Sequence, residues 1–238
     1  MTPLEPLPGV KRKAVACIPC FNTKPFIGDI VSSARNFVDQ VIVIDDGSHD
    51  GTGESARLAG ALVVDHHTNK GYGEAIKSCF DIARANGAEL LVILDGDGQH
   101  NPGEIPRLLA PILRGEADFV IGSIFLTNEH NMPRYRKFGI RVITFLWNFG
   151  AGLKVSDAQS GFRAYDKKLF EAIPLSEKGM SVSIEIIEKA RRRGVVIKEV
   201  PTSCLYVHSH FNLKSIMHGL NAALSVVRIR LLSSWRKL

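Results

Sequence analysis

The sequence predicts an α/β protein in which helices cover both faces of a mostly parallel sheet. Short β-branched runs such as Val41–Ile44 alternate, over the first two-thirds of the chain, with helically spaced segments such as Ile27–Val38. The run Leu90–Leu94 is apolar throughout, which is typical of a strand buried on both faces. With 45% hydrophobic and 23% charged residues, the chain can bury a sizeable core, and this composition excludes a disordered, collagen-like or coiled-coil chain.

Most of the expected elements have a residue that explains where they stop. Pro19 should end the first strand, Gly87 the third helix and Pro201 the last strand. In chain order we expect strands at Ala14–Ile18, Val41–Ile44, Ala61–Val64, Leu90–Leu94, Phe119–Ile121, Phe162–Tyr165 and Val195–Val200, and helices at Ile27–Val38, Thr52–Leu58, Gly73–Asn86, Ile105–Arg114, Arg134–Gly150 and Ser183–Arg193. Leu213–Trp235 has the apolar spacing of a further, amphipathic helix at the C-terminus.

These elements divide the chain of 238 residues into three parts. We expect an N-terminal extension at residues 1–13, an α/β domain at 14–206 and a basic amphipathic segment at 207–238. The extension has no apolar run of the signal-peptide kind, and neither Phe138–Leu153 nor Ile216–Leu232 is long and uninterrupted enough to span a bilayer. Four cysteines do not form a disulfide framework and fit a reducing compartment.

The positive charge is concentrated at the C-terminal end. The chain has 30 Lys and Arg against 24 Asp and Glu, and Val200–Leu238 contains five basic and no acidic residues. The rest therefore has 25 basic and 24 acidic residues, a net charge of +1. This pattern predicts an anionic membrane surface as partner and gives no support for a nucleic acid. We expect a cytoplasmic protein, bound peripherally at the cytoplasmic face of a membrane.

The strongest chemical motif follows the buried strand Leu90–Leu94. Asp95 and Asp97 can point into one crevice if the backbone turns, and Gly96 and Gly98 permit that turn. Two neighbouring carboxylates repel each other, so a divalent cation such as Mg²⁺ or Mn²⁺ would resolve the repulsion. Gln99 adds a carbonyl oxygen as a third candidate ligand. The alternative is a solvated Asp-Gly turn.

Polar clusters also follow other strands, at the edge where parallel sheets bind ligands. Asp45 and Asp46 follow the second strand and can accept hydrogen bonds from a nucleoside. Lys70 and Gly71 precede a helix, where backbone N–H groups and a lysine can meet a phosphate. The adjacent pair His66-His67 is expected to face solvent.

A fourth cluster lies later in the chain and suggests an acceptor site. Asp157, Ser160 and Arg163 supply an acid, a hydroxyl and a guanidinium within seven residues. The basic residues Arg134, Arg136, Lys137 and Arg141 precede them. The alternative for this cluster is an Asp–Arg pair that orders a loop.

Five motifs in order resemble glycosyltransferase family 2, and most closely its dolichol-phosphate mannose synthase-like branch. They are Ile18-Pro19-Cys20-Phe21-Asn22, the run Val43 to Thr52, Asn69-Lys70-Gly71-Tyr72-Gly73, the run Leu94 to His100, and Ser160-Gly161-Phe162-Arg163. The resemblance covers about Ala14 to Tyr206, which is most of the chain. It implies a GT-A fold for the central domain, a nucleotide-diphosphate sugar as donor, linked to UDP or GDP, and an inverting transfer to a polyprenyl phosphate.

The resemblance also implies roles for individual residues. The donor would be held by Pro19, Asn22, Asp45, Asp46, Lys70, Gly71, Asp95, Gly96 and Asp97, and the metal by Asp95, Asp97 and Gln99. Asp157 and Arg163 are the catalytic candidates, with Asp157 the base if the acceptor is a hydroxyl. The acceptor would meet Arg134, Arg136, Arg141 and Ser160.

Three positions depart from the family pattern and keep other functions open. Thr23 stands where the family often has Glu, and Ile124 stands where lipid-phosphate members commonly have Arg. Ile140 stands where mannose synthases have Ser. The alternatives are therefore a hydroxyl acceptor, on a glycan or glycolipid, and a non-catalytic nucleotide-sugar-binding membrane adaptor. A phosphatase of the haloacid-dehalogenase type is a weaker alternative, because its Asp-x-Asp motif usually lies on the first strand.

Overall fold

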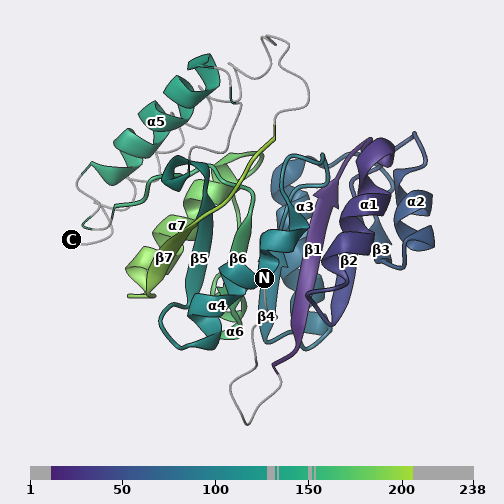
Figure 1. Ribbon diagram of the computed structural model, residues 1–238, viewed down its shortest axis with the longest axis horizontal. Coiled ribbons are helices and arrows are strands. Elements are labelled where there is room, and N and C mark those ends of the chain that lie inside the picture. Colours follow the sequence, from purple (N-terminus) through teal and green to yellow (C-terminus); the bar gives the residue numbers. More distant parts are fainter. Residues whose placement is uncertain (1–11, 128–131, 133, 150–151, 153, 206–238) are drawn as a thin grey trace.

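The computed structural model contains a single seven-stranded sheet (Figure 1). It describes residues 12–127, 132, 134–149, 152 and 154–205. The expected C-terminal helix at Leu213–Trp235 and nearly all of the N-terminal extension lie outside these residues. Among the helices that the structure describes, none is both long enough and apolar enough to cross a membrane.

The strand order is β3-β2-β1-β4-β6-β5-β7, which places the apolar strands β1 and β4 near the middle. The strands are β1 (Ala14–Cys20), β2 (Gln40–Asp45), β3 (Leu62–Asp65), β4 (Leu90–Ile93), β5 (Phe119–Ser123), β6 (Arg163–Asp166) and β7 (Ile197–Pro201). All neighbouring pairs are parallel except those that β6 makes with β4 and β5. The mostly parallel sheet that the sequence predicts is confirmed, with one strand reversed.

Helices cover both faces of the sheet, as predicted. They are α1 (Lys24–Ala34), α2 (Thr52–Leu58), α3 (Tyr72–Ala85), α4 (Ile105–Leu113), α5 (Arg134–Asn148), α6 (Lys167–Ala172) and α7 (Ser181–Arg192), with 3₁₀ turns η1 (Pro102–Glu104) and η2 (Ile124–Leu126). One core joins the sheet to α3, α5, α6 and α7, and the other joins it to α1, α2 and α4. Alternate residues of β1, such as Cys17 and Ile18, enter opposite cores, so this strand is buried on both faces.

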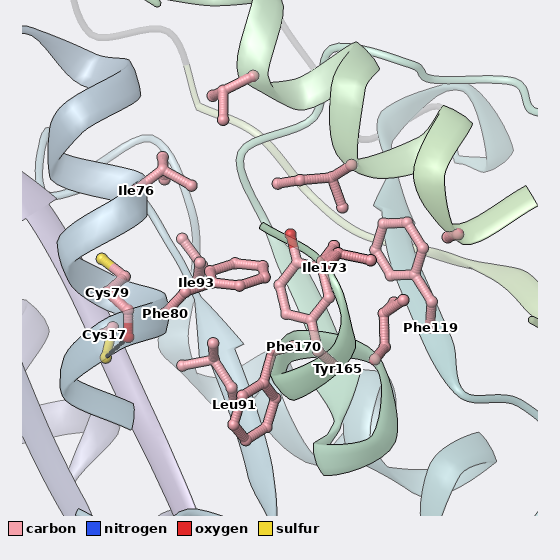
Figure 2. Close-up of a cluster of buried hydrophobic side chains, with 14 of the residues drawn as sticks. Cys17, Ile76, Cys79, Phe80, Leu91, Ile93, Phe119, Tyr165, Phe170 and Ile173 are labelled. Carbon is pink, nitrogen blue, oxygen red and sulfur yellow. Dashed lines mark hydrogen bonds between the residues drawn. The ribbon is translucent and has the colours of Figure 1, made fainter. Parts of the chain in front are cut away.

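An aromatic cluster fixes the reversed strand β6 within the first core. Tyr165 stacks on Phe119 of β5 with ring centroids 4.8 Å apart, and meets Phe80 of α3 edge-on at 5.2 Å. Figure 2 shows Tyr165 between these two rings, with Phe170 of α6 below them. This packing joins β6 to both halves of the sheet, and it thereby sets the position of the loop that precedes β6.

Two expectations about local structure need correction. Pro19 does not end the first strand, which continues to Cys20. The β1–β4 pairing stops at Cys17, so the missing N–H of Pro19 interrupts no pair with β4, and the carbonyl of Cys20 still accepts a hydrogen bond from Asp46 of the β2 side. Helix α6 was also not anticipated, because its six residues are too few to show a helical period.

Candidate active site

The carboxyl ends of β1, β2 and β4 meet at one edge of the sheet and carry the polar residues that the sequence indicates. β1 is followed by Asn22, β2 ends at Asp45, and Asp95 comes two residues after β4. Because β6 runs in the opposite direction, its first residue, Arg163, and the preceding Gly161 lie at this same edge, where Arg163 pairs with Ile93. The third motif joins this edge as well, because the Tyr72 hydroxyl donates to Asp95 and the Lys70 N–H to Asp46, so the structure brings all five motifs together.

Asp95 is half-buried and is contacted by residues of two other motifs of this edge. Its side chain is 30% exposed, its Oδ1 accepts a hydrogen bond from the Tyr72 hydroxyl at 3.3 Å, and its Oδ2 lies 3.8 Å from Nε2 of His100. A Cβ added to Gly161 would lie 2.0 Å from Oδ2 of Asp95. Only glycine therefore allows the loop before β6 to approach this carboxylate.

Asp97 is half-buried and is hydrogen-bonded by the residue that follows its turn. Gln99 donates its backbone N–H to Oδ1 of Asp97 at 3.1 Å and its side-chain amide to Oδ2 at 2.7 Å. Burial and the negative charge of Asp95 raise the pKa of Asp97. Gly98 has a φ of +80°, so the turn that the glycines were expected to permit is present.

His100 is a site residue to which the sequence analysis gave no role. Its side chain is 8% exposed, its ring packs 5.3 Å from that of Phe162, and its Nδ1 has no hydrogen-bond partner among the described residues. Burial alone would lower the pKa of His100, but the nearby carboxylates Asp95, Asp97 and Asp157 raise it overall. The only signal in the sequence was its place directly after the acidic motif.

Asn22 and Asp45 organise the loops at the ends of β1 and β2. Asn22 adopts a left-handed conformation with φ of 54°, its N–H donates to the Ser48 hydroxyl and its Oδ1 accepts from the His49 N–H. Asp45 is buried and accepts the Ser48 N–H at 3.0 Å. A Cβ on Gly53 would lie 2.7 Å from Oδ2 of Asp45, so this carboxylate packs against the start of α2.

Asp46 is buried and accepts hydrogen bonds from the segment that precedes α3. Its Oδ1 and Oδ2 accept the backbone N–H groups of Lys70 and Gly71 at 2.9 and 2.8 Å. Nδ1 of His66 lies 2.7 Å from Oδ1 of Asp46, and Nε2 of the same ring lies 2.9 Å from the Ser78 hydroxyl on α3. The expectation that His66 faces solvent is wrong for this residue, because it is 7% exposed, whereas His67 is exposed.

Lys70 and Gly71 face an open side of the molecule. The Lys70 side chain is exposed and makes no ion pair with any other described residue. Gly71 has a φ of +90°, and a Cβ added to it would meet nothing within 4 Å. The space directly beside Gly71 is therefore open.

Arg163 is buried and braces the loop before β6. Its guanidinium donates to the backbone carbonyls of Ala158, Ser160 and Ser183 at 2.9, 2.7 and 2.9 Å. These bonds tie the loop to α7 and occupy three of the five N–H donors of the guanidinium. The arrangement agrees with the loop-ordering alternative for this residue, with carbonyl groups in place of a carboxylate as partners.

Asp157 is 2% exposed and lies beside half-buried Glu199 of β7. Its backbone N–H donates to Glu199, which also accepts the N–H and hydroxyl of Ser156. Burial raises the pKa of Asp157 to about 6, with the negative charge of Glu199 adding to the effect and the Gln159 N–H and Arg163 opposing it. A carboxyl group with this pKa can accept a proton near neutral pH.

The candidate acceptor residues are not drawn into one cluster by the contacts that the structure describes. Ser160 is buried, and its hydroxyl accepts the Phe162 N–H at 3.2 Å. Arg141 is exposed on α5, with its guanidinium 5.6 Å from the Phe125 ring. Arg134 and Arg136 lie in the first turn of α5, and their side chains are outside what the structure describes. Their acceptor roles stay predictions.

The acidic residues at this edge fit a divalent cation in their chemistry. Asp95 and Asp97 supply hard oxygen ligands, and a bound cation would oppose the rise in the pKa of Asp97 that burial and the charge of Asp95 cause. Within the described part of the chain, no three His, Cys, Asp or Glu side chains converge on one point. Further ligands would therefore have to be substrate oxygens or water. Gln99 turns its amide NH₂ toward Asp97, and its role as a ligand stays a prediction.

Comparison with known proteins identifies the family. The profile described as Glycosyl transferase family 2 matches residues 15–173. The chain belongs to glycosyltransferase family 2. It is 34% identical over 203 residues to polyprenol monophosphomannose synthase of Mycolicibacterium smegmatis, covering 80% of this chain and 76% of that protein. It is 30% identical over 240 residues to undecaprenyl-phosphate mannosyltransferase of Micrococcus luteus, covering 95% and 97%.

Solved structures share this fold. Glucosyl-3-phosphoglycerate synthase from Mycobacterium tuberculosis, crystallised with Mn²⁺, UDP-glucose and phosphoglyceric acid, superposes with a TM-score of 0.74 and is 23% identical. The superposition covers 91% of this chain and 79% of that chain. The GT-A fold and the glycosyltransferase class that the sequence predicts are thereby confirmed.

The buried carboxyl of Asp157 should make stability depend on pH. Its pKa of about 6 lies above the value of 3.8 for an unperturbed aspartate, so the folded state binds the proton more tightly and loses stability as pH rises from about 4 to about 6. Asp157→Asn should remove up to about 3 kcal/mol of this loss. The measurement is urea unfolding of both proteins at several pH values between 4 and 7.

A matched control is Asp29→Asn, which changes an exposed carboxyl on α1. The difference between its free energy of unfolding and that of the wild type should be the same at every pH in this range. If the difference between Asp157→Asn and the wild type were also independent of pH, the raised pKa of Asp157 would be contradicted.

Proposed function

We propose that this glycosyltransferase moves a sugar from a nucleotide-diphosphate sugar to a polyprenyl phosphate, with inversion and with a bound divalent cation. The observation that carries the proposal is the pair Asp95 and Asp97, held together at the edge where β1, β2 and β4 end. A half-buried pair of carboxylates is suited to a cation that bridges to a diphosphate. The solved relative that was crystallised with Mn²⁺ and UDP-glucose supports this choice of cation and donor.

The nature of the acceptor is supported by the relatives. The two mannosyltransferases named above carry polyprenol or undecaprenyl phosphate in their names, and one of them aligns with almost the whole chain. A third relative, from Methanococcus voltae, is named for UDP-N-acetylglucosamine and dolichyl phosphate and is 28% identical over 211 residues. The relatives differ in their sugars, so the donor base stays open between uridine and guanosine.

The donor would lie across the ends of β1, β2 and β4. Asn22 and Asp45, with Pro19 at the end of β1, would contact the nucleoside. Exposed Lys70, together with Gly71, would contact the diphosphate. Asp95 and Asp97, with Gly96 between them, would hold the cation, which would supply positive charge to the same diphosphate. Asp46 would act on the donor through the backbone of the segment that it holds, because both its oxygens already accept protein N–H groups.

The reaction would be a single displacement. An oxygen of the lipid phosphate forms a bond to the anomeric carbon while the bond from that carbon to the diphosphate oxygen breaks, and the nucleoside diphosphate leaves with the electron pair. When bound, the cation neutralises charge on the leaving diphosphate. The acceptor oxygen is already anionic, so this chain need not remove a proton from it.

A hydroxyl acceptor is the second candidate, and Asp157 is the observation that favours it. A hydroxyl must lose a proton as it attacks, and the pKa of Asp157, about 6, suits a general base. The glucosyl-3-phosphoglycerate synthase was also crystallised with glucosyl-3-phosphoglycerate, a compound in which the sugar is joined to phosphoglycerate and not to a lipid phosphate. A non-catalytic adaptor is less well supported, because it would not need the acidic pair.

We also propose that the enzyme works at the cytoplasmic face of a membrane. Its acceptor would be a lipid, and no described helix is suited to span the bilayer. The basic segment 207–238, whose structure lies outside the described residues, and the exposed basic side chain of Arg141 could meet anionic headgroups.

The proposal predicts a specific product and its loss on one substitution. The purified full chain, with Mn²⁺, a panel of labelled UDP- and GDP-sugars and polyprenyl phosphates of several lengths, should form a labelled lipid. Asp97→Asn should reduce this transfer by at least about 100-fold, since it weakens the charge that holds the cation. The readout is labelled lipid separated by chromatography.

Asp29→Asn is the control in this assay and should retain the wild-type rate. Transfer to 3-phosphoglycerate, with none to any lipid phosphate, would favour the hydroxyl acceptor. Undiminished lipid transfer by Asp97→Asn would contradict the role of the acidic pair.

A further inference from the structure

Helix α5 exposes large apolar side chains along one face. Phe138 is 71% exposed, Phe145 is 66% exposed and Val142, between them, is 38% exposed. The opposite face is buried against the core through Ile143 and Trp147, which are 5% and 0% exposed. Spacings of four and three residues place Phe138, Val142 and Phe145 in one stripe, which we call the α5 stripe. A stripe of this size calls for an apolar partner.

The charges beside the α5 stripe indicate what kind of partner this is. Residues 131–156 contain five basic and no acidic residues. Two of them are Lys137, which is half-buried, and Arg141, which is exposed. An apolar face flanked by basic side chains is typical of a helix that lies in the headgroup region of an anionic bilayer.

Charge also argues against two other partners for the α5 stripe, the C-terminal segment of the same chain and a second copy of the chain. The C-terminal segment is itself basic and free of acids from Val200 to Leu238, so it would repel α5 rather than neutralise it. A second copy of the chain would place the same basic residues against each other. Only an anionic partner satisfies both the phenylalanines and the charges.

We propose that the α5 stripe is the surface through which this protein lies on anionic phospholipid. Phe138 and Phe145 enter the boundary between headgroups and acyl chains, and Lys137 and Arg141 face the phosphates. The inference deepens the proposed function, since α5 leads directly to the loop that contains Asp157 and would bring a lipid acceptor to that side of the site.

The test uses the full chain and vesicles, without donor or acceptor. The wild type should co-sediment with vesicles of equal parts phosphatidylglycerol and phosphatidylcholine at least about tenfold more tightly than with phosphatidylcholine alone. The double variant Phe138→Ser/Phe145→Ser should bind the anionic vesicles at least about tenfold more weakly than the wild type. Circular dichroism and a thermal melt check that it is folded.

The matched control is Leu58→Ser, which removes an 80% exposed leucine from α2. Figure 1 shows α2 and α5 at opposite ends of the molecule, so vesicle binding should not change. Equal binding by the double variant and the wild type would overturn the proposal. A concentration-dependent dimer that the double variant abolishes, with vesicle binding intact, would assign the stripe to a second copy instead. Because no sugar transfer is measured, the outcome is independent of the proposed reaction.

A second inference rests on the buried hydrogen bonds of His66, which no step of the reaction uses. An ionised carboxylate only accepts hydrogen bonds, so Nδ1 of His66 donates to Asp46, and Nε2 of the same ring forms a hydrogen bond with the Ser78 hydroxyl. The ring therefore links α3 to the carboxylate that holds the N–H groups of Lys70 and Gly71. Both links are 2.9 Å or shorter.

We infer that His66 is a positioning residue for the donor diphosphate. By fixing Asp46 it orients the backbone of Lys70 and Gly71, the segment that would meet the diphosphate. This inference rests on the proposed donor site. A ring that only filled space would leave donor affinity unchanged when replaced by an apolar side chain of similar size.

His66→Leu should speed hydrogen exchange at the amides of Lys70 and Gly71 and raise the KM for the donor sugar by about tenfold, with kcat within about threefold. His66→Asn keeps a donor near the position of Nδ1 and should recover most of the wild-type KM. His67→Leu, which changes the exposed neighbour, is the control and should alter neither quantity.

Faster exchange with an unchanged donor KM would overturn the inference, because the network would then be structural only. If His66→Leu does not fold, the comparison of His66→Asn with Ser78→Ala replaces it, and Ser78→Ala should raise the donor KM. A wild type that turns over no donor refutes the proposed function instead, and the exchange rates then still report whether His66 orders the segment.

Discussion

The half-buried pair of carboxylates at the end of β4 is the constraint on which the rest of the site depends. Asp97 is costly to ionise, because water is partly excluded from it and the neighbouring Asp95 carries the same charge. The surrounding residues reduce this cost only in part. Tyr72 donates to Asp95, Gln99 donates to Asp97, and His100 stands close to Asp95. The arrangement leaves a strong local demand for positive charge.

The reversed strand β6 creates this partial burial. Its aromatic residue Tyr165 is held between Phe80 and Phe119, and its first residue, Arg163, is bound by three carbonyl groups. Together these contacts bring Gly161 against Asp95. The chemistry of the acidic pair and the packing of the core are therefore connected through one short strand. Arg163 contributes to the site by shaping it, whether or not it also meets substrate.

Local periodicity was enough to predict the fold, but not the direction of every strand or the surroundings of single side chains. The buried runs of β1 and β4 and the glycine turn after Asp95 are marked in the sequence by residue type alone. The direction of β6 depends on its neighbours in space, and a run of four residues does not encode it. For the same reason His66, next to exposed His67, carried no sign that its ring lies between Asp46 and Ser78. Pro19 was misjudged because the end of the β1–β4 pairing cannot be read from β1 itself.

The claim that Asp95 and Asp97 bind a cation together with a nucleoside diphosphate is tested most directly by electron paramagnetic resonance of Mn²⁺. Titration of the full chain in the presence of UDP or GDP should show one bound Mn²⁺ per chain. The signal of bound Mn²⁺ should be lost when Asp95 is replaced by asparagine. Mn²⁺ binding that is equally tight after this replacement, or no binding with either nucleotide, would contradict the account.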